Sequence, residues 1–293
     1  MSKIKVGKRG YYYLTSRDTQ ILKFLWNWKL ASTATIHEAL CRPNSPYSTY
    51  KKLERLEKQN FITTAESFEY NFLCWQLSDK GFGAIRESLG DLKEEGYLSE
   101  NLWHDRNVLA FQLGEWMLHD FPFVTHYTEQ QLRRRGEDYY PSWLPHLSGH
   151  RSDGYTHISV NGKESVLAYE VELWPKNTAR YESIIKFYDS ARKFERVFWL
   201  VGDPMVKDEI IRAKTCAKDK SLNYHVFVDL VEYMQRGWDA AVTNERSQKL
   251  FTIRGNFQQT LGEPYSELLA NPWGESRVSV HYNKRKVIGK KHT

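Results

Sequence analysis

Residues 153–172 read DGYTHISVNGKESVLAYEVE and carry the pattern of a β-hairpin. Two runs rich in apolar residues, 154–160 and 164–173, flank Asn161-Gly162, a dipeptide typical of a two-residue hairpin turn. Each run has the length of one strand. An acidic residue immediately precedes the first run, and others lie within the second. The second half of the chain is therefore expected to be built on this hairpin.

The segments on either side of the hairpin predict an α/β unit. Their order is helix, three strands, helix, strand, helix and strand, at residues 104–121, 123–127, 154–160, 164–173, 178–193, 196–202, 204–218 and 224–228. Three consecutive strands before the next helix favour a mixed sheet over a regular alternation of strands and helices. Residues 236–293 show no clear period and are expected to wrap this unit or to dock a partner.

The N-terminal segment predicts a winged helix-turn-helix. Thr15 and Asp18 have the spacing of a helix cap and its capping box, and apolar residues at helical spacing follow. Two more helical patterns, two alternating runs and a further helical pattern lie between residues 32 and 89. The third helix is expected to present groups that reach phosphates and base edges, at Tyr47, Ser48, Thr49, Lys51 and Lys52. The alternative is a small helical module that contacts proteins.

Both ends of the chain are basic. The net charge is +6, but eleven lysines and arginines lie before Asp18 or after Glu275, which leaves residues 18–276 with a net charge of −5. Basic ends on a slightly acidic body suit contacts with DNA phosphates, because such contacts release counterions. The alternative is that these ends only aid solubility.

The composition argues against several other classes of protein. The chain has 293 residues, 41% hydrophobic and 27% charged, as expected for a folded globular protein. No apolar run approaches the roughly 20 residues that span a bilayer, and the first residues lack an apolar signal segment, so we expect a cytoplasmic protein without a membrane partner. The wide spacing of Cys41, Cys74 and Cys216 argues against a disulfide framework or a cysteine-built zinc site.

Three carboxylates are expected to meet at one end of the hairpin. Glu170 and Glu172 lie two residues apart on the second strand and therefore point to the same face, while Asp153 opens the paired strand. Hard cations such as Mg²⁺ prefer oxygen ligands, and a cation held there polarises a phosphodiester and activates water. Lys176 and Arg180 follow closely and are candidates to stabilise charge on phosphate. The alternative is an exposed acidic face paired with nearby lysines.

Tyr181 is a further catalytic candidate, and His104, Asp105 and Glu115 are secondary candidates. His104 and Asp105 open a predicted helix, where they serve either as ligand or base or as a capping pair. Glu115, on the same helix, faces either the carboxylates or solvent. Tyr181 is either a nucleophile or a packed aromatic residue.

These motifs together resemble the replication-relaxation family, which includes the MOBC-type relaxases of mobilisable plasmids. The resemblance covers residues 14–202 and rests on the winged-helix pattern and on HDRNVLAF (104–111), RSDGYTHI (151–158), YEVELWPKNTARYESIIKFY (169–188) and VFWLV (197–201). Its most specific part is the series Asp153, Glu170, Glu172, Lys176, Arg180 and Tyr181. The family is similar in turn to PD-(D/E)XK nucleases. The resemblance therefore implies an α+β protein whose second domain is a restriction-endonuclease-like α/β domain.

The activity that this resemblance implies is metal-dependent nicking of DNA at a plasmid transfer origin, with the winged helix recognising the site. Asp153 and Glu170 would bind Mg²⁺ or Mn²⁺. Glu172 would add a ligand or act as a base, and Lys176 would contact the scissile phosphate. The implied partners are double-stranded DNA and accessory mobilisation proteins. The sequence departs from the nuclease pattern because Glu172 stands where ExK has lysine, and Lys176 is the nearest basic residue.

Two alternatives share these features. A non-enzymatic replication or transcription regulator would bind DNA and keep a degenerate nuclease-like domain for homodimerisation. A host-defence nuclease would use the same chemistry on another substrate. The expected division of the chain is a basic arm and winged helix, a linker, a PD-(D/E)XK nuclease-like domain and an extension with a basic tail, at 1–89, 90–100, 101–235 and 236–293.

Overall fold

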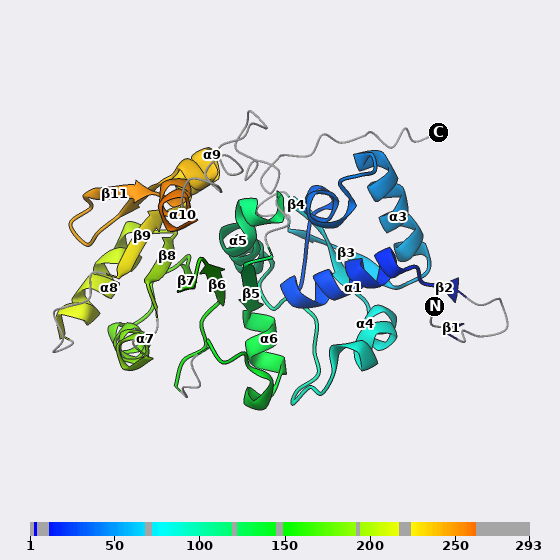
Figure 1. Cartoon of the computed structure of the whole chain (residues 1–293), viewed down its shortest axis with the longest axis horizontal. Helices are drawn as coiled ribbons and strands as arrows, with labels where there is room; N and C mark the ends of the chain where they lie inside the picture. The colour runs from blue at the N-terminus through cyan, green and yellow to red at the C-terminus, as the bar shows by residue number, and fades with distance from the viewer. Residues whose placement is uncertain are drawn as a thin grey trace. The chain divides into compact units, whose positions relative to one another are not determined.

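The computed structural model describes residues 3–4, 12–67, 72–118, 122–144, 149–191, 194–216 and 224–261. They form an α+β protein with a seven-stranded mixed sheet (Figure 1). They separate into two compact units, one up to Arg106 and one from Asn107 onward. No helix in this part of the chain is both long and apolar enough to cross a membrane. The predicted basic tail and most of the basic arm lie outside the described residues.

The first unit contains the predicted order of three helices, a hairpin and a helix. Its elements are β1 (Lys3–Ile4), β2 (Tyr12–Tyr13), α1 (Ser16–Trp28), α2 (Thr33–Ile36), a π-helical turn (His37–Cys41), α3 (Pro46–Lys58), β3 (Ile62–Ser67), β4 (Phe72–Leu77), α4 (Asp79–Ile85) and a 3-10 turn (Arg86–Leu89). Helices α1 to α4 each begin at a Ser or Thr whose hydroxyl accepts from a backbone N–H of the first turn. These caps satisfy donors that a helix start leaves unpaired.

An ion pair with a buried carboxylate joins α1 and α3 in the first unit. The capping box of Thr15 and Asp18 forms as predicted. Arg55 of α3 donates to Asp18 Oδ1 at 2.6 Å, and Asp18 is fully buried. Burial alone would raise the pKa of Asp18, but the bonds from Arg55 and Thr15 lower it. Around this pair α1 and α3 bury the apolar residues Ile21, Leu22, Leu25, Leu53 and Leu56.

Residues 90–100, expected to form a linker, pack on the first unit. Tyr97 stacks on Phe82 of α4 with ring centroids 5.1 Å apart. Trp26 Nε1 of α1 donates to the backbone oxygen of Gly96 at 3.1 Å. The division between the two units falls after Arg106, within α5 (Leu102–Leu113).

The second unit is built on the seven-stranded sheet. After α5 its elements are a 3-10 turn (Gly114–Leu118), β5 (Val124–Thr128), α6 (Glu129–Arg134), a 3-10 turn (Glu137–Tyr139), β6 (Gly154–Val160), β7 (Lys163–Glu172), α7 (Thr178–Ala191), β8 (Arg196–Val201), α8 (Pro204–Cys216), β9 (His225–Asp229), α9 (Leu230–Arg236), a 3-10 turn (Gly237–Asp239), β10 (Ala241–Thr243), β11 (Lys249–Thr252) and α10 (Ile253–Leu261). The strand order is β11-β10-β9-β8-β7-β6-β5. Strands β5, β6 and β7 are antiparallel neighbours, whereas β8 and β9 run parallel to β7. The predicted mixed sheet is confirmed.

The β6–β7 hairpin forms with the predicted turn. Val160 pairs with Lys163, and the two residues between them, Asn161 and Gly162, have φ values of 52° and 75°. Positive φ at both central positions is what a type I′ turn requires. The turn fixes the register of the hairpin, and so places the residues before β6 beside the carboxyl-terminal half of β7.

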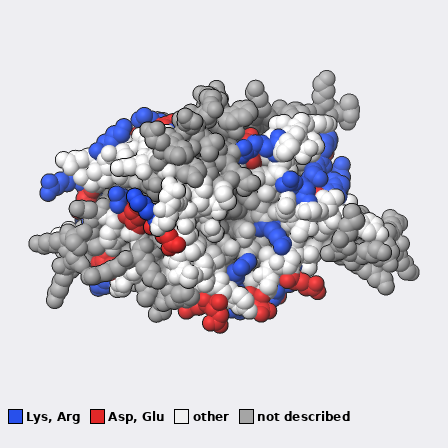
Figure 2. Space-filling view, in the orientation of Figure 1, with Lys and Arg blue, Asp and Glu red and all other residues white. Residues whose placement is uncertain are grey.

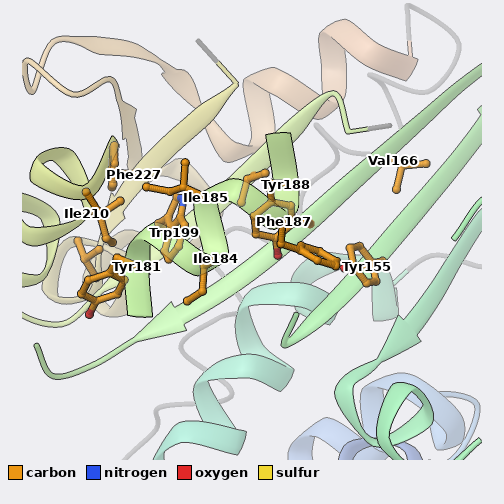
Figure 3. Close-up of a cluster of buried hydrophobic side chains, with 14 of the residues drawn as sticks. Tyr155, Val166, Tyr181, Ile184, Ile185, Phe187, Tyr188, Trp199, Ile210 and Phe227 are labelled. Carbon is orange, nitrogen blue, oxygen red and sulfur yellow. The ribbon is translucent and has the colours of Figure 1, made fainter. Parts of the chain in front are cut away.

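Side chains of β7 alternate between two covered faces. On one face, α7 and α8 pack on a buried cluster (Figure 3) that includes Tyr155, Val166, Tyr181, Ile185, Tyr188, Trp199 and Ile210. On the other face, Tyr169 meets the ring of Phe111 of α5 edge-on, with centroids 5.5 Å apart. Tyr233 of α9 also lies there, and its hydroxyl donates to the backbone oxygen of Ala110 at 2.7 Å. The strand is therefore shielded on both sides.

Two parts of this unit differ from the prediction. The helix expected at 104–121 ends at Leu113, because Gly114 has a φ of 43°, outside the helical range. A Cβ at this position would lie 2.1 Å from the Trp238 ring, which explains why the residue is glycine. Residues 241–261, where no period is visible, form β10, β11 and α10, and β10 and β11 extend the sheet. The sequence pattern also misses α6 and α9. These elements have three to nine residues, too few for a period to show.

Candidate functional site

Three carboxylates lie near the carboxyl-terminal end of β7. Glu170 and Glu172 are 2% and 3% exposed, and Glu170 points toward α7, where the Tyr188 hydroxyl donates to it. Glu172 shares this face by strand alternation, as predicted. Asp153 precedes β6, and its Oδ2 accepts from the backbone N of Val171 at 2.7 Å. The structure thus holds Asp153 beside the residue that separates the two glutamates.

Two donors hold the carboxylate of Glu170. His150 Nε2 donates to Glu170 Oε1 at 2.7 Å, and the Tyr188 hydroxyl donates to the same oxygen. Burial alone would lower the pKa of His150, but the nearby carboxylate raises it above its usual value. Burial and Glu170 both raise the pKa of Tyr188, so the hydroxyl keeps its proton. The sequence pattern does not point to His150, because a single loop histidine has no spacing that links it to a strand.

Glu172 is paired with Lys176. Lys176 Nζ lies 2.7 Å from the Glu172 carboxylate. Burial raises the pKa of Glu172 to about 7; the Lys176 cation opposes this rise, and the charges of Glu170 and Asp153 add to it. Glu170 and Asp153 therefore both act on Glu172, and this repulsion favours a proton or cation bound at Glu172.

Arg180 and Tyr181 begin α7 in different surroundings. Arg180 is exposed, and its backbone N donates to Asn177 Oδ1 at 2.9 Å. Tyr181 is fully buried, and its hydroxyl accepts from the backbone N of Lys176 at 3.2 Å. Burial raises the pKa of Tyr181 to about 12, which disfavours the phenolate that a nucleophilic tyrosine needs. Tyr181 thus fits the packed alternative and anchors the loop that carries Lys176.

The secondary candidates have partners of their own. His104 and Asp105 belong to the first unit, where Lys29 Nζ lies 3.1 Å from Asp105 Oδ1. Both expectations for Glu115 are wrong, because this residue is buried and Arg254 of α10 donates to its two oxygens at 2.7 and 2.8 Å. The two partners are 139 residues apart, so no local pattern predicts the pair.

The exposed side of α3 carries three of the five residues predicted to contact DNA. Tyr47 is 63% exposed, and Ser48 and Lys51 are also exposed. Lys52 is half-buried, with Nζ 3.7 Å from Asp18 Oδ1. Lys and Arg side chains gather over α3 in Figure 2. This side of the helix is therefore a basic, hydroxyl-bearing surface.

Thr49, the fifth predicted contact, does not reach this surface. It is 1% exposed, and its hydroxyl is hydrogen-bonded to His37 Nδ1 at 3.0 Å. Thr49 lies four residues before the buried Leu53, which puts both on the inner face of α3. The expectation that Thr49 points outward is therefore wrong.

The donor set fits a hard divalent cation in its chemistry. The oxygens of Asp153, Glu170 and Glu172 are the ligand type that Mg²⁺ and Mn²⁺ prefer. Burial is the main cause of the raised pKa of Glu172, and the charges of Glu170 and Asp153 add to it. The His150 ring contacts Glu170, and the Lys176 ammonium contacts Glu172. Within the described ranges, no three His, Cys, Asp or Glu side chains form a group that could hold a metal ion.

Comparison of the chain with protein-family models, with curated proteins and with solved structures gave no significant match. The residues of the site are therefore the basis on which a function is inferred.

Proposed function

We propose that this protein binds double-stranded DNA and nicks it in a metal-dependent reaction, as a relaxase-like protein in plasmid mobilisation. The observation that carries the proposal is the contact between Lys176 and the Glu172 carboxylate at 2.7 Å. It puts a cation at the carboxylate cluster although Glu172 occupies the position that a nuclease lysine would take. The order α5, β5, α6, β6, β7, α7, β8, in which the short helix α6 is inserted between the first two strands, supports a PD-(D/E)XK-like core of the replication-relaxation type.

Each residue near the carboxylates has a role in this proposal. Asp153 and Glu170 would hold Mg²⁺ or Mn²⁺, which when bound polarises the phosphodiester and activates water. Glu172 would either add a ligand or act as a base. Lys176 supplies positive charge where the phosphate becomes more negative. Glu172, with a pKa of about 7, is suited to accept a proton at neutral pH. His150 orients Glu170 by donating to Oε1.

Recognition of DNA is assigned to the first unit in this proposal. Three capped helices followed by the β3–β4 hairpin support a winged helix-turn-helix with α3 as the recognition helix. Tyr47, Ser48 and Lys51 are exposed along one side of α3 and suit contacts with phosphates and base edges. Arg180, exposed at the start of α7, adds a cation on the second unit.

Lys51→Gln should weaken DNA binding. Lys51 is exposed on α3, and each phosphate contact of this kind adds about one unit to the slope of log affinity against log salt. Fluorescence anisotropy with duplexes from the neighbouring genomic region, at several salt concentrations, measures the affinity and this slope. Lys58→Gln, at the other end of the same helix, should leave both unchanged. If both variants bind like the wild type, α3 is not the recognition helix.

The nicking activity is tested on supercoiled plasmid that carries the DNA flanking the protein's own coding region. The wild type should produce relaxed circles with Mg²⁺ or Mn²⁺ and none with a chelator, because the carboxylates need a cation to act on phosphate. Gel electrophoresis separates the two plasmid forms. Specific DNA binding without relaxed circles under either metal would reject the nuclease proposal.

A DNA-binding regulator without nuclease activity is the second candidate. The observation in its favour is that protein side chains already contact the carboxylates: the His150 ring donates to Glu170, and the Lys176 ammonium contacts Glu172. In this reading the second unit is a degenerate nuclease domain that serves dimerisation. The nicking assay separates the two candidates directly.

A further inference from the structure

A second polar site lies toward the opposite end of the parallel strands from the carboxylates. A pocket of about 800 Å³ is lined by residues at the starts of β8 and β9, at the end of α8 and on the β10–β11 hairpin. Arg196 of its lining opens β8, whereas Glu170 and Glu172 pair with Trp199 and Val201 farther along that strand. This pocket is therefore separate from the candidate nicking site.

The lining of the pocket carries positive charge. Arg196, Lys214 and Arg246 all contribute to it, and Glu245 is an acidic residue in the same lining. Glu245 forms an ion pair with Lys214, which offsets both charges. The two guanidinium groups that remain favour an anion, and arginine is the side chain best shaped to bind phosphate oxygens in pairs.

A buried donor points to the same class of ligand. His225 lines the pocket and is 2% exposed. Its Nδ1 accepts from Trp199 Nε1 at 2.9 Å, and because an indole N–H only donates, the proton of the neutral ring is on Nε2. This Nε2 is buried, and no hydrogen-bond partner for it lies among the described residues. A buried N–H without an acceptor is costly, so an anionic oxygen there would satisfy it.

An aromatic side chain supplies an apolar wall. Phe251 of β11 lines the pocket, and the Arg196 guanidinium lies 6.0 Å from its ring centroid. A flat ring next to a guanidinium suits a ligand with a planar part joined to an anionic part. The pocket volume is within the range of about 300 to 1,000 Å³ that small-molecule sites occupy.

We propose that this pocket binds a small organic phosphate of nucleotide size. Arg196, Arg246 and the Nε2–H of His225 hold the phosphate, and Phe251 contacts the planar part of the ligand. The proposal stands apart from the proposed nicking activity, since the two sites share no residue.

Isothermal titration calorimetry of the full chain tests the proposal with adenosine diphosphate, inorganic phosphate and adenosine as probes. The diphosphate should bind the wild type, and Arg246→Gln should weaken binding about tenfold, the effect of losing one hydrogen bond to a charged group. Lys249→Gln is the matched control, because Lys249 is exposed on the same hairpin but is not part of the pocket lining. It should bind like the wild type, inorganic phosphate should compete, and adenosine should not bind.

A second measurement does not depend on a variant. The ¹⁵N resonance of His225 Nε2 should shift when the diphosphate binds, because the N–H gains an acceptor. The proposal is overturned if the diphosphate does not bind, if adenosine binds equally well, or if the two variants weaken binding equally. Displacement of the diphosphate by an equimolar short DNA duplex would assign the pocket to DNA phosphates instead of a small molecule.

Discussion

Glu170→Gln should abolish metal-dependent nicking while the protein stays folded and bound to DNA. The substitution keeps the shape of the side chain and an oxygen that accepts from His150 and Tyr188, so the packing under α7 is preserved. It removes the negative charge that a cation at this cluster requires. Loss of a residue that only orients a metal ligand lowers metal affinity or activity roughly 10- to 100-fold. Loss of a direct ligand should therefore lower the nicking rate more than about 100-fold. The rate of conversion of supercoiled plasmid, at matched protein concentration, measures the effect.

Two control variants separate this prediction from simpler explanations. Glu164→Gln changes an acid on the same strand that is exposed, and it should nick like the wild type. Tyr181→Phe removes the hydroxyl that accepts from Lys176 N. This variant should retain most of the activity, because the raised pKa of Tyr181, about 12, disfavours a nucleophilic phenolate. An active Glu170→Gln variant would show that the cluster is not the reaction centre. An inactive Tyr181→Phe variant that keeps its fold would restore the nucleophile hypothesis.

The fold is predictable from the sequence wherever a period extends over a whole element. The strand pattern on both sides of Asn161-Gly162 gives β6, β7 and their register, because a turn with two positive φ values admits few residue types. Elements of three to seven residues, such as β10 and α6, escape prediction because they contain at most two turns or a few alternations. The end of α5 at Leu113 is not predictable from the sequence either. The glycine that follows it is required by the Trp238 ring, which lies far along the chain.

The candidate site is predictable to the extent that its residues are close in sequence. Strand alternation places Glu170 and Glu172 on one face, and four residues of chain are enough to bring Lys176 back to Glu172. His150 and Arg254 could not be predicted, because the loop or helix that carries each one reaches its partner only through the tertiary fold. Thr49 shows the opposite limit. The polar pattern of α3 predicts that its hydroxyl points outward, but its position four residues before Leu53 places it on the inner face.

Glu115→Gln should destabilise the second unit by about 3 kcal/mol without lowering the nicking rate of the folded protein. Glu115 is buried, and its two oxygens accept from Arg254 at 2.7 and 2.8 Å. Removing one partner of a buried ion pair costs about 3 to 5 kcal/mol, because the other charge stays buried. Arg254 keeps Asp239, whose Oδ1 accepts from it at 2.9 Å, so the lower end of this range is expected. Urea unfolding followed by circular dichroism and tryptophan fluorescence measures the free energy of unfolding.

An exposed ion pair on the same unit provides the control for this prediction. Glu182 and Lys186 of α7 lie 3.8 Å apart with side chains 32% and 68% exposed, so Glu182→Gln should cost less than about 0.5 kcal/mol. A Glu115→Gln variant as stable as the wild type would mean that the pair with Arg254 does not support the packing of α10 beside Trp116 and Trp238. Loss of nicking with unchanged stability would instead return Glu115 to the site, as a residue that acts on the carboxylates from outside their cluster. The two readouts together therefore decide between a structural and a catalytic role for this glutamate.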